Sequence, residues 1–560
     1  MRVDGKPEGV RQSMSWLHTW SGLLLGWLLY AVFFTGTLSY FLNEVNDWMR
    51  PELHQSVPNP RTAELAVAAM QKLAPDASNW TINLPGERQT AVEASWRNPG
   101  AASGRAGTQR VQIDAGTGEV IKPRETRGGS FLYRFHFELY AMPRIWGRWI
   151  VGIATLFMFV AIISGVITHK KIFTDFFTFR PRKGQRSWLD AHNATAVLAL
   201  PFHIIITFSG LLLLMFMLMP WGVNAVYEGD TQKYFSESRG ARGGDRGAGE
   251  GNDRGNRQQA RQAAELTPIG PLMKIAQAQW PGRGVGSIAV NQPGSPRATI
   301  ELREQGGRSV ARSSGERMLF DGITGESKAM PEAHAPSTAQ AVSGTMTGLH
   351  LGRFADPAMR WLLFLSGVIG TVMAGSGMVL WVVKRLPERR KLGRIPRGHR
   401  LVEILNVGAI GGLSVATAAY FWSNRLLPVE MAQRPDMEIR SFFIVWGLCL
   451  LHAALRSHRR AWLEQLWLAA IAFAALPVLN MATGGVALPA AIFRGQWSVA
   501  GFDLLVLALG ILHGFAAWKL GKSAAMLTPP RAAKNNAGNP ANGAAVHFPR
   551  AMPQAPEKQA

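Results

Sequence analysis

Apolar residues are gathered into long runs along this chain, instead of recurring at the spacing of an amphipathic soluble helix. Eight runs approach or exceed the roughly 20 residues that a membrane-spanning helix needs. The pattern therefore predicts a polytopic α-helical membrane protein with about eight transmembrane helices, the first of them uncleaved. The runs cover residues 16–42, 146–168, 190–219, 357–383, 401–424, 440–456, 460–480 and 499–520.

Basic residues are concentrated in three of the short polar stretches between these runs. The stretches are HKKIFTDFFTFRPRKGQR, KRLPERRKLGRIPRGHR and RSHRR, and they follow the second, fourth and sixth runs. By the positive-inside rule they lie in the cytoplasm together with both termini, and the long segments 43–145 and 220–356 lie outside. This distribution accounts for the net charge of +23 without a nucleic-acid partner. A bacterial inner membrane with its large loops in the periplasm fits best.

The two long external segments show the same order of patterns. Each begins with a helical stretch, TAELAVAAMQKLAP or IGPLMKIAQAQWP, and continues with alternating stretches such as WTINL and SIAVN. Each closes on D-x-x-T-G-E, at 114–119 and 321–326, which predicts a hairpin turn. We therefore expect two small α+β domains. The Gly- and Arg-rich insertion 233–263 and the tail 521–560 cannot build a core and are expected to be disordered.

The similarity between the external segments extends into the membrane. When His18 is aligned with His192, Phe34-Thr-Gly36 falls on Phe208-Ser-Gly210 without a gap, and the segments before the second and fourth runs place His136 opposite His350. The first four helices are therefore predicted to be an internal duplication. The expected parts are 1–42 (helix 1), 43–145, 146–219 (helices 2 and 3), 220–356, 357–384 (helix 4) and a C-terminal four-helix region at 401–520.

Six histidines belong to the first four predicted helices. Three are expected at the cytoplasmic side, two at the external side and one within the third helix, and ionisable residues at such depths are usually functional. If the third helix were straight, His192 and His203 would lie about 16 Å apart on nearly the same face. Pro201 is expected to bend the helix near His203. The histidines are, in that order, His18, His169, His192, His136, His350 and His203.

Histidines in this pattern indicate non-covalently bound haem. Neutral imidazole is a standard axial ligand of haem iron. Cys449 is the only cysteine, which excludes a Cys-ligated iron–sulfur cluster and a C-x-x-C-H haem attachment. Zinc would require nearby carboxylates or thiols that these helices lack. A single histidine at a helix end more often binds headgroups or water, but six at matched depths favour haem b.

Several of these stretches together resemble the PepSY-associated transmembrane helix family. They are WLHTWSGL, GVITHKKIFTDFFTFRP, DAHN, LPFHIIITFSGLLL and GLHLGRF, in the family's order around both D-x-x-T-G-E segments, over about residues 10–390. The family includes iron-regulated inner-membrane proteins and ferric-siderophore reductases. The resemblance implies two PepSY-like periplasmic domains and two haems b. It also implies an oxidoreductase that carries electrons outward and reduces Fe³⁺ in a ferric siderophore to Fe²⁺, which such chelators hold weakly.

The same resemblance implies the ligands of the haem irons. Its motif histidines correspond to His18, His136, His169, His192, His203 and His350 of this chain. By the duplication we assign His136 and His350 to an outer haem, with His203 as a possible substitute. The inner haem would take two of His18, His169 and His192. No residue pair suited to acid–base catalysis is evident, and none is needed for electron transfer.

Three matters stay open at the level of the sequence. The electron donor is a cytoplasmic reductase or a quinol, because the chain has no G-x-G-x-x-G or P-loop motif. His452 and His513, in the C-terminal region, belong to a third haem, a quinol site or, more simply, helix packing. Arginines near the external histidines hold haem propionates, attract an anionic ferric chelate, or are ordinary interfacial residues; they are Arg134, Arg144, Arg148, Arg353 and Arg360.

Two other functions remain as alternatives. One is electron transfer from haem b to a quinone or a partner protein instead of to ferric iron. The other is a non-redox PepSY protein that binds or regulates a partner. The first alternative shares the haem cofactors with the reductase hypothesis, whereas the second predicts a colourless protein.

Overall fold

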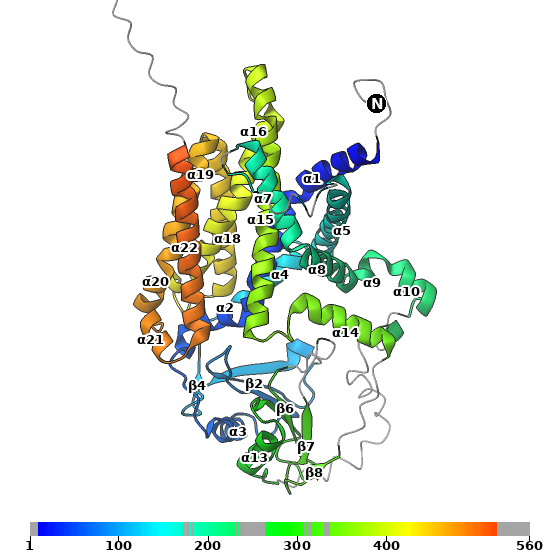
Figure 1. Ribbon diagram of the computed structural model, residues 1–560. Coiled ribbons are helices and arrows are strands. Elements are labelled where there is room, and N and C mark those ends of the chain that lie inside the picture. The colour runs from blue at the N-terminus through cyan, green and yellow to red at the C-terminus, as the bar shows by residue number, and fades with distance from the viewer. Residues whose placement is uncertain are drawn as a thin grey trace, which may run out of the picture. The chain divides into compact units, whose positions relative to one another are not determined.

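Figure 1 shows the fold in a computed structural model. The structure describes residues 9–102, 104–169, 171, 174, 179–181, 183–230, 232–234, 237, 264–306, 310, 316–329 and 337–523. Most of the insertion 233–263 and residues 524–560 of the tail, both expected to be disordered, lie outside the described residues. The chain divides into one compact unit, residues 1–517, and a short second unit, residues 518–560.

Seven helical segments of the described chain are long and apolar enough to cross a membrane, and a bent pair of helices makes up to eight. The predicted number of about eight spans agrees with this finding. The seven segments are α1 (Val10–Leu38) continued by α2 (Leu42–Trp48), α5 (Arg144–Thr168), α15 (Pro357–Leu392), α16 with α17 (Arg397–Val407, Leu413–Leu426), α18 (Arg434–Leu455), α19 with α20 (His458–Ala474, Leu476–Ala482) and α22 (Trp497–Ser523).

The third predicted span is the bent pair. Helices α7 (Gln185–Leu198) and α8 (Leu200–Leu213) meet at an angle of 66°. Short helices α9 (Met215–Leu218) and α10 (Pro220–Tyr227) follow. Pro201 lies in the first turn of α8, where it cannot donate to the preceding turn, so the predicted bend is confirmed. The straight-helix geometry considered for His192 and His203 does not apply, because the 66° bend lies between them; both side chains line one cavity.

The external segments share a single antiparallel sheet of eight strands in the order β4-β3-β2-β1-β5-β6-β7-β8. Strands β1 and β5 pair at its centre, with Ile82 opposite Ile288, both fully buried. Helices α3 (Thr62–Leu73) and α13 (Ile269–Gln279) cover one face, away from the spanning helices (Figure 1). The strands are Asn79–Asn83, Val92–Arg97, Thr108–Ile113, Val120–Ile121, Val285–Asn291, Thr299–Glu304, Arg317–Asp321 and Ser327–Lys328.

Both D-x-x-T-G-E motifs form the same tight turn. In the first, Asp114 Oδ1 accepts hydrogen bonds from the backbone of Gly116 and Thr117, each at 2.8 Å. In the second, Asp321 Oδ1 accepts from Ile323 at 2.9 Å and Thr324 at 3.0 Å. The glycine of each motif has a positive φ, 79° and 75°, which a residue with a side chain rarely adopts. The predicted hairpin turns are therefore confirmed.

Two helices connect the sheet to the spanning helices. Helix α4 (Gly129–Glu138) follows β4 and packs on α1 and α5, and α14 (Thr338–Leu351) follows β8 and packs on α8. Their last turns carry His136 and His350. Helix α1 lies between α5 and α15, and α7 packs on α15. The histidines of both connecting helices are thus brought against the first and third predicted spans.

Candidate functional site

Two cavities lie within the group of helices formed by α1, α5, α7, α8 and α15. The sheet-side cavity, about 580 Å³, is bordered by α4 and α14 and contains His136 and His350. The far cavity, about 520 Å³, contains His18, His169 and His192. Leu29 and Met158 line both cavities, so only a thin apolar layer separates them. Their volumes are in the range of sites for organic cofactors.

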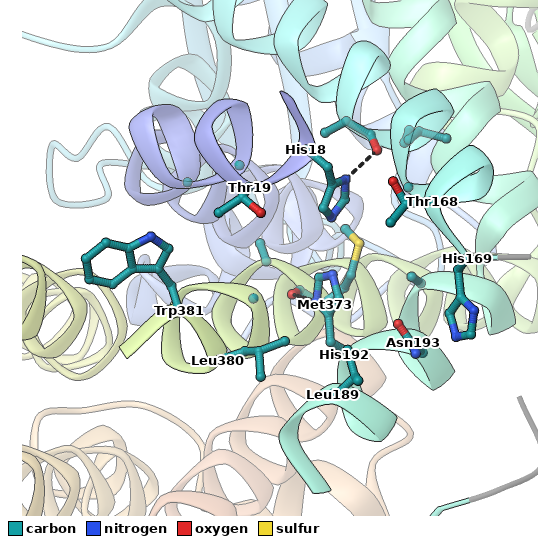
Figure 2. A pocket seen from close by; sticks show the side chains of 18 of the residues that line it. His18, Thr19, Thr168, His169, Leu189, His192, Asn193, Met373, Leu380 and Trp381 are labelled. Atoms are coloured by element: carbon teal, nitrogen blue, oxygen red, sulfur yellow. Dashed lines mark hydrogen bonds between the residues drawn. The ribbon is translucent and has the colours of Figure 1, made fainter. Parts of the chain in front are cut away.

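The far cavity brings together two histidines from different helices. The rings of His18, on α1, and His192, on α7, have centroids 6.1 Å apart (Figure 2). His18 Nδ1 lies 2.9 Å from the carbonyl oxygen of Ala161, and His192 Nδ1 lies 3.0 Å from that of Met373. A carbonyl oxygen can only accept, so each Nδ1 carries the proton and each Nε2 keeps its lone pair. This is the tautomer in which Nε2 binds a metal ion.

The sheet-side cavity repeats this arrangement. The ring centroids of His136 and His350 are 6.2 Å apart. His136 Nδ1 donates to the carbonyl oxygen of Val32 at 2.7 Å, and His350 Nδ1 lies 3.0 Å from Ser209 Oγ. Both residues are therefore oriented through Nδ1, which leaves Nε2 available.

A glycine on a neighbouring helix makes room for each of the four rings. A Cβ at Gly36 would lie 2.5 Å from His136 Cε1, and a Cβ at Gly210 would lie 3.0 Å from His350 Cε1. A Cβ at Gly165 would lie 3.1 Å from His18 Cε1, and a Cβ at Gly377 would lie 3.0 Å from His192 Cε1. A serine or threonine precedes each glycine; the pairs are Thr35-Gly36, Ser164-Gly165, Ser209-Gly210 and Ser376-Gly377. The sequence reasoning aligned the first of these pairs with the third but assigned them no role, and it did not recognise the other two.

The ring separations agree with those of two imidazoles that bind one metal ion from opposite sides. An imidazole nitrogen lies about 2.0 Å from a bound transition metal and its ring centre about 1.1 Å further, which gives about 6.2 Å between two centres. The observed 6.1 and 6.2 Å agree with this value. No group of three or more metal-ligating side chains is found among the described residues, so a four-ligand centre has no support there. Haem, which needs only two axial ligands and an apolar surround, fits both cavities.

The structure places the other two candidate histidines in the far cavity. His203 is 1% exposed and its Nε2 has no hydrogen-bond partner among the described residues. His203 therefore lies in the same cavity as His18 and His192. It does not line the cavity of His136 and His350, for whose haem it was considered as a substitute ligand. His169 follows the end of α5 and is set apart from the two facing rings (Figure 2).

Three arginines near the sheet-side cavity surround one buried carboxylate. Glu138 lies 2.5 Å from Arg148 and 3.9 Å from both Arg134 and Arg144. Arg148 also lines the cavity. This group, with three cations and one anion, carries excess positive charge. Arg353 and Arg360 are the arginines near His350 in the sequence. Arg360 lies 3.6 Å from Glu44, and Arg353 is exposed.

His452 and His513, the two histidines considered for a third haem or a quinol site, have both ring nitrogens engaged. His452 Nε2 is 2.6 Å from Glu464 Oε2, and its Nδ1 is 3.2 Å from Gln465 Nε2. His513 bonds the carbonyl oxygen of Leu509 at 2.8 Å and Ser414 Oγ at 3.0 Å. These contacts favour the packing interpretation of both residues over a third haem or a quinol site.

One protein family matches this sequence. Its description is PepSY-associated TM region, and the match covers residues 15–384. No curated protein matches. The matched range runs from α1 into α15, and it includes the connecting helices α4 and α14 and both cavities with their histidines.

Proposed function

The chain belongs to the PepSY-associated TM family and is a multi-pass membrane protein, and from this premise we propose that it is a di-haem b ferric-siderophore reductase. In this proposal electrons pass from the far side of the membrane to the sheet side. The acceptor is the Fe³⁺ of a siderophore, which is released as Fe²⁺. The paired histidines of the two cavities are the observation that carries the proposal.

The chain's own residues would bind and orient the cofactors. His18 with His192 would hold one haem and His136 with His350 the other, each through Nε2. The Nδ1 contacts with Ala161, Met373, Val32 and Ser209 fix the direction of each ring. A bound haem b would supply a one-electron redox centre, which suits the reduction of Fe³⁺ by one electron. The apolar walls of both cavities would keep water from the cofactors.

The orientation of the protein in the membrane is part of the proposal. We infer that the basic stretches after α5, α15 and α18 lie in the cytoplasm of a bacterial cell and that the sheet lies in the periplasm. The two halves of the sheet would then be PepSY-like domains, and the first four spans an internal duplication. Matched element orders, matched D-x-x-T-G-E turns and matched histidine–glycine contacts in residues 10–168 and 185–392 support this inference.

The charge near the sheet-side cavity favours an anionic substrate. Arg134, Arg144 and Arg148 outnumber the carboxylate of Glu138, and Arg144 is largely exposed. An exposed cationic group attracts anions from solution and raises their local concentration. A ferric siderophore with net negative charge would therefore be drawn to the side at which it is to be reduced.

The test is the reoxidation of the dithionite-reduced protein. We expect anaerobic stopped-flow mixing with ferric siderophores to restore the oxidised haem spectrum faster than mixing with buffer. Arg144→Gln should lower the second-order rate constant at low salt, while Arg440→Gln, an exposed control on α18, should not. If no ferric siderophore reoxidises the haems but a quinone does, the acceptor is a quinone. A colourless protein would favour a non-redox PepSY function.

A further inference from the structure

A second group of polar side chains is buried near the far cavity, between α15, α16 and α19. We call it the far-end cluster; it consists of Trp381 and Arg389 on α15, His399 and Glu403 on α16, and His458 on α19. Glu403 Oε1 lies 2.7 Å from Arg389 Nη1 and 3.9 Å from His399 Nδ1. The rings of Trp381 and His399 have centroids 5.6 Å apart. Helix α16 also packs on α19, which begins at His458.

The cluster is unusual because four of its nitrogen atoms are buried without hydrogen bonds among the described residues. His399 is 6% exposed, and neither of its ring nitrogens has a hydrogen-bond partner among the described residues. The same holds for Trp381 Nε1 and His458 Nδ1. Buried polar groups are nearly always paired, and an unpaired one destabilises the fold. Four such atoms on three neighbouring side chains indicate that the cluster binds a polar group from outside the chain.

The cluster is adjacent to the far cavity. Trp381 lines this cavity with His18 and His192 (Figure 2). Its ring also contacts that of His399. Trp381 is therefore shared between the cavity and the cluster. A redox partner bound at the cluster would contact a residue that also lines the far cavity.

The cluster lies at the cytoplasmic boundary of the spanning helices, because Arg389, His399 and His458 belong to the basic stretches that we assign to the cytoplasm. Large apolar side chains are exposed on the same helices, including Leu401 on α16 and Leu392 on α15, at 55% and 50%. A buried carboxylate, Glu403, provides a proton acceptor, and its charge is balanced by Arg389 and by Arg400 at 3.5 Å. The ligand should therefore come from the lipid phase, present oxygen atoms to N–H groups, and release protons when it is oxidised.

We propose that the far-end cluster binds the headgroup of a membrane hydroquinone, the electron donor of this protein. The proposal rests on the function proposed above and names its missing reductant. His399 and Trp381 would contact the ring oxygens, and Glu403 would receive protons through His399. One hydroquinone loses the hydrogens of both O–H groups and becomes a quinone. Its two electrons reduce two Fe³⁺ chelates to Fe²⁺, and its two protons pass to the cluster and then to water on the far side.

The test uses the oxidised holoprotein and a short-chain ubiquinol. On anaerobic mixing we expect the wild-type haem bands to become reduced. His399→Phe keeps an aromatic ring but has no nitrogen, and Trp381→Phe removes only the indole N–H group with part of the ring. Each variant should be reduced about tenfold more slowly, as expected when one hydrogen bond to the reacting headgroup is lost. His452→Gln, on neighbouring α18, is the matched control and should be reduced at the wild-type rate.

Two reference reactions separate this proposal from the function on which it rests. Dithionite should reduce His399→Phe and His452→Gln fully, and ferric siderophore should reoxidise both at the wild-type rate, since neither reaction uses the cluster and neither residue lines the far cavity. If ubiquinol does not reduce the wild type while both reference reactions proceed, the hydroquinone proposal is wrong and the reductase function stands. Equal ubiquinol rates in the wild type and both variants would also overturn it. If the siderophore reaction fails in the wild type, the proposed function itself is wrong.

Discussion

Four histidine rings in this protein share one local arrangement. Each ring has its Nδ1 next to an oxygen of a neighbouring helix and its edge against a glycine, so that only Nε2 faces the cavity. Both constraints are needed, because the Nδ1 contact fixes the tautomer and the glycine allows the close approach. The identity of these histidines could be predicted from the sequence. The glycines were aligned with one another but not assigned a role, since their use depends on which helices are neighbours.

Substitution of one of these glycines should disturb one cofactor. A Cβ at position 36 would lie 2.5 Å from the ring of His136, so Gly36→Ala must displace that ring. We expect the haem signal of the sheet-side cavity to shift or disappear and that of the far cavity to remain. The measurement is the low-temperature spectrum of the α bands. Gly447→Ala, where a Cβ would meet nothing within 4 Å, should leave both signals unchanged.

Alanine substitution of the histidines should separate ligands from neighbours. His136→Ala and His18→Ala should each remove one bis-histidine low-spin signal from the electron paramagnetic resonance spectrum, and the two lost signals should differ. His169→Ala should leave both signals, because His169 is set apart from the facing pair (Figure 2). Loss of a signal in His169→Ala together with an unchanged spectrum in His18→Ala would assign the far-cavity ligands differently.

A charged pair distinguishes the two D-x-x-T-G-E turns. Lys328 lies 2.8 Å from Asp321 and, with backbone donors, holds the pKa of this carboxyl well below its usual range. A lowered folded pKa stabilises the fold above the unfolded pKa, near 3.9, and the effect is lost as the pH falls below it. At pH 7, Asp321→Asn should destabilise β7–β8 by about 1 kcal/mol for this partly exposed pair, which corresponds to roughly fivefold faster hydrogen exchange.

The matched variant for this prediction is Asp114→Asn. Asp114 makes the same turn, but among the described residues no lysine is paired with it. Asparagine keeps the accepting Oδ1, so exchange in β3–β4 should change little. In β7–β8, the ratio of the hydrogen-exchange rate of Asp321→Asn to that of the wild type should also approach one as the pH falls below about 4. A ratio that stays constant with pH would show that the charge of Asp321 does not contribute.

At the scale of elements, the sequence predicted the spanning helices but not which distant elements pair with one another. Long apolar runs determine a spanning helix by themselves, and Pro201 indicated the 66° bend between α7 and α8. The pairing of β1 with β5 joins segments about 200 residues apart, and no local pattern specifies such a pair. The sequence therefore predicted two small α+β domains but not that their strands join in one sheet.

The C-terminal helices depend on a buried ion pair. Arg434 and Glu438, on α18, are fully buried and lie 2.5 Å apart. Removal of one member of a buried pair leaves an uncompensated charge, at a cost of about 3–5 kcal/mol. Arg434→Met should therefore lower the thermal midpoint in detergent strongly, and Arg434→Met with Glu438→Gln should recover part of the loss.

The control for this pair is an exposed one in the same region. Arg456 and Glu464 are 51% and 38% exposed and lie 3.1 Å apart. Surface pairs contribute about 0–1 kcal/mol, so Arg456→Met should change the midpoint only slightly. Comparable shifts in Arg434→Met and Arg456→Met would contradict the role assigned to the buried pair.

At the scale of the whole molecule, both cavities lie where the two halves of the matched region meet. Each facing pair takes one histidine from residues 10–168 and one from residues 185–392, and the central strands β1 and β5 come from the same two parts. Neither half contains a complete pair. The sequence alignment of His18 with His192 and of His136 with His350 anticipated this correspondence. The sequence did not show that these corresponding residues face each other, because this depends on how α1, α7, α4 and α14 pack.

The central claim is that each facing pair holds one haem b. The most direct measurement is the haem content of the purified full-length protein, determined by pyridine haemochrome together with quantitative amino-acid analysis. The account predicts two haems b per chain in the wild type and one per chain in both His18→Ala and His136→Ala. A wild-type protein that contains no haem, or only one, when purified from cells supplied with haem would contradict it.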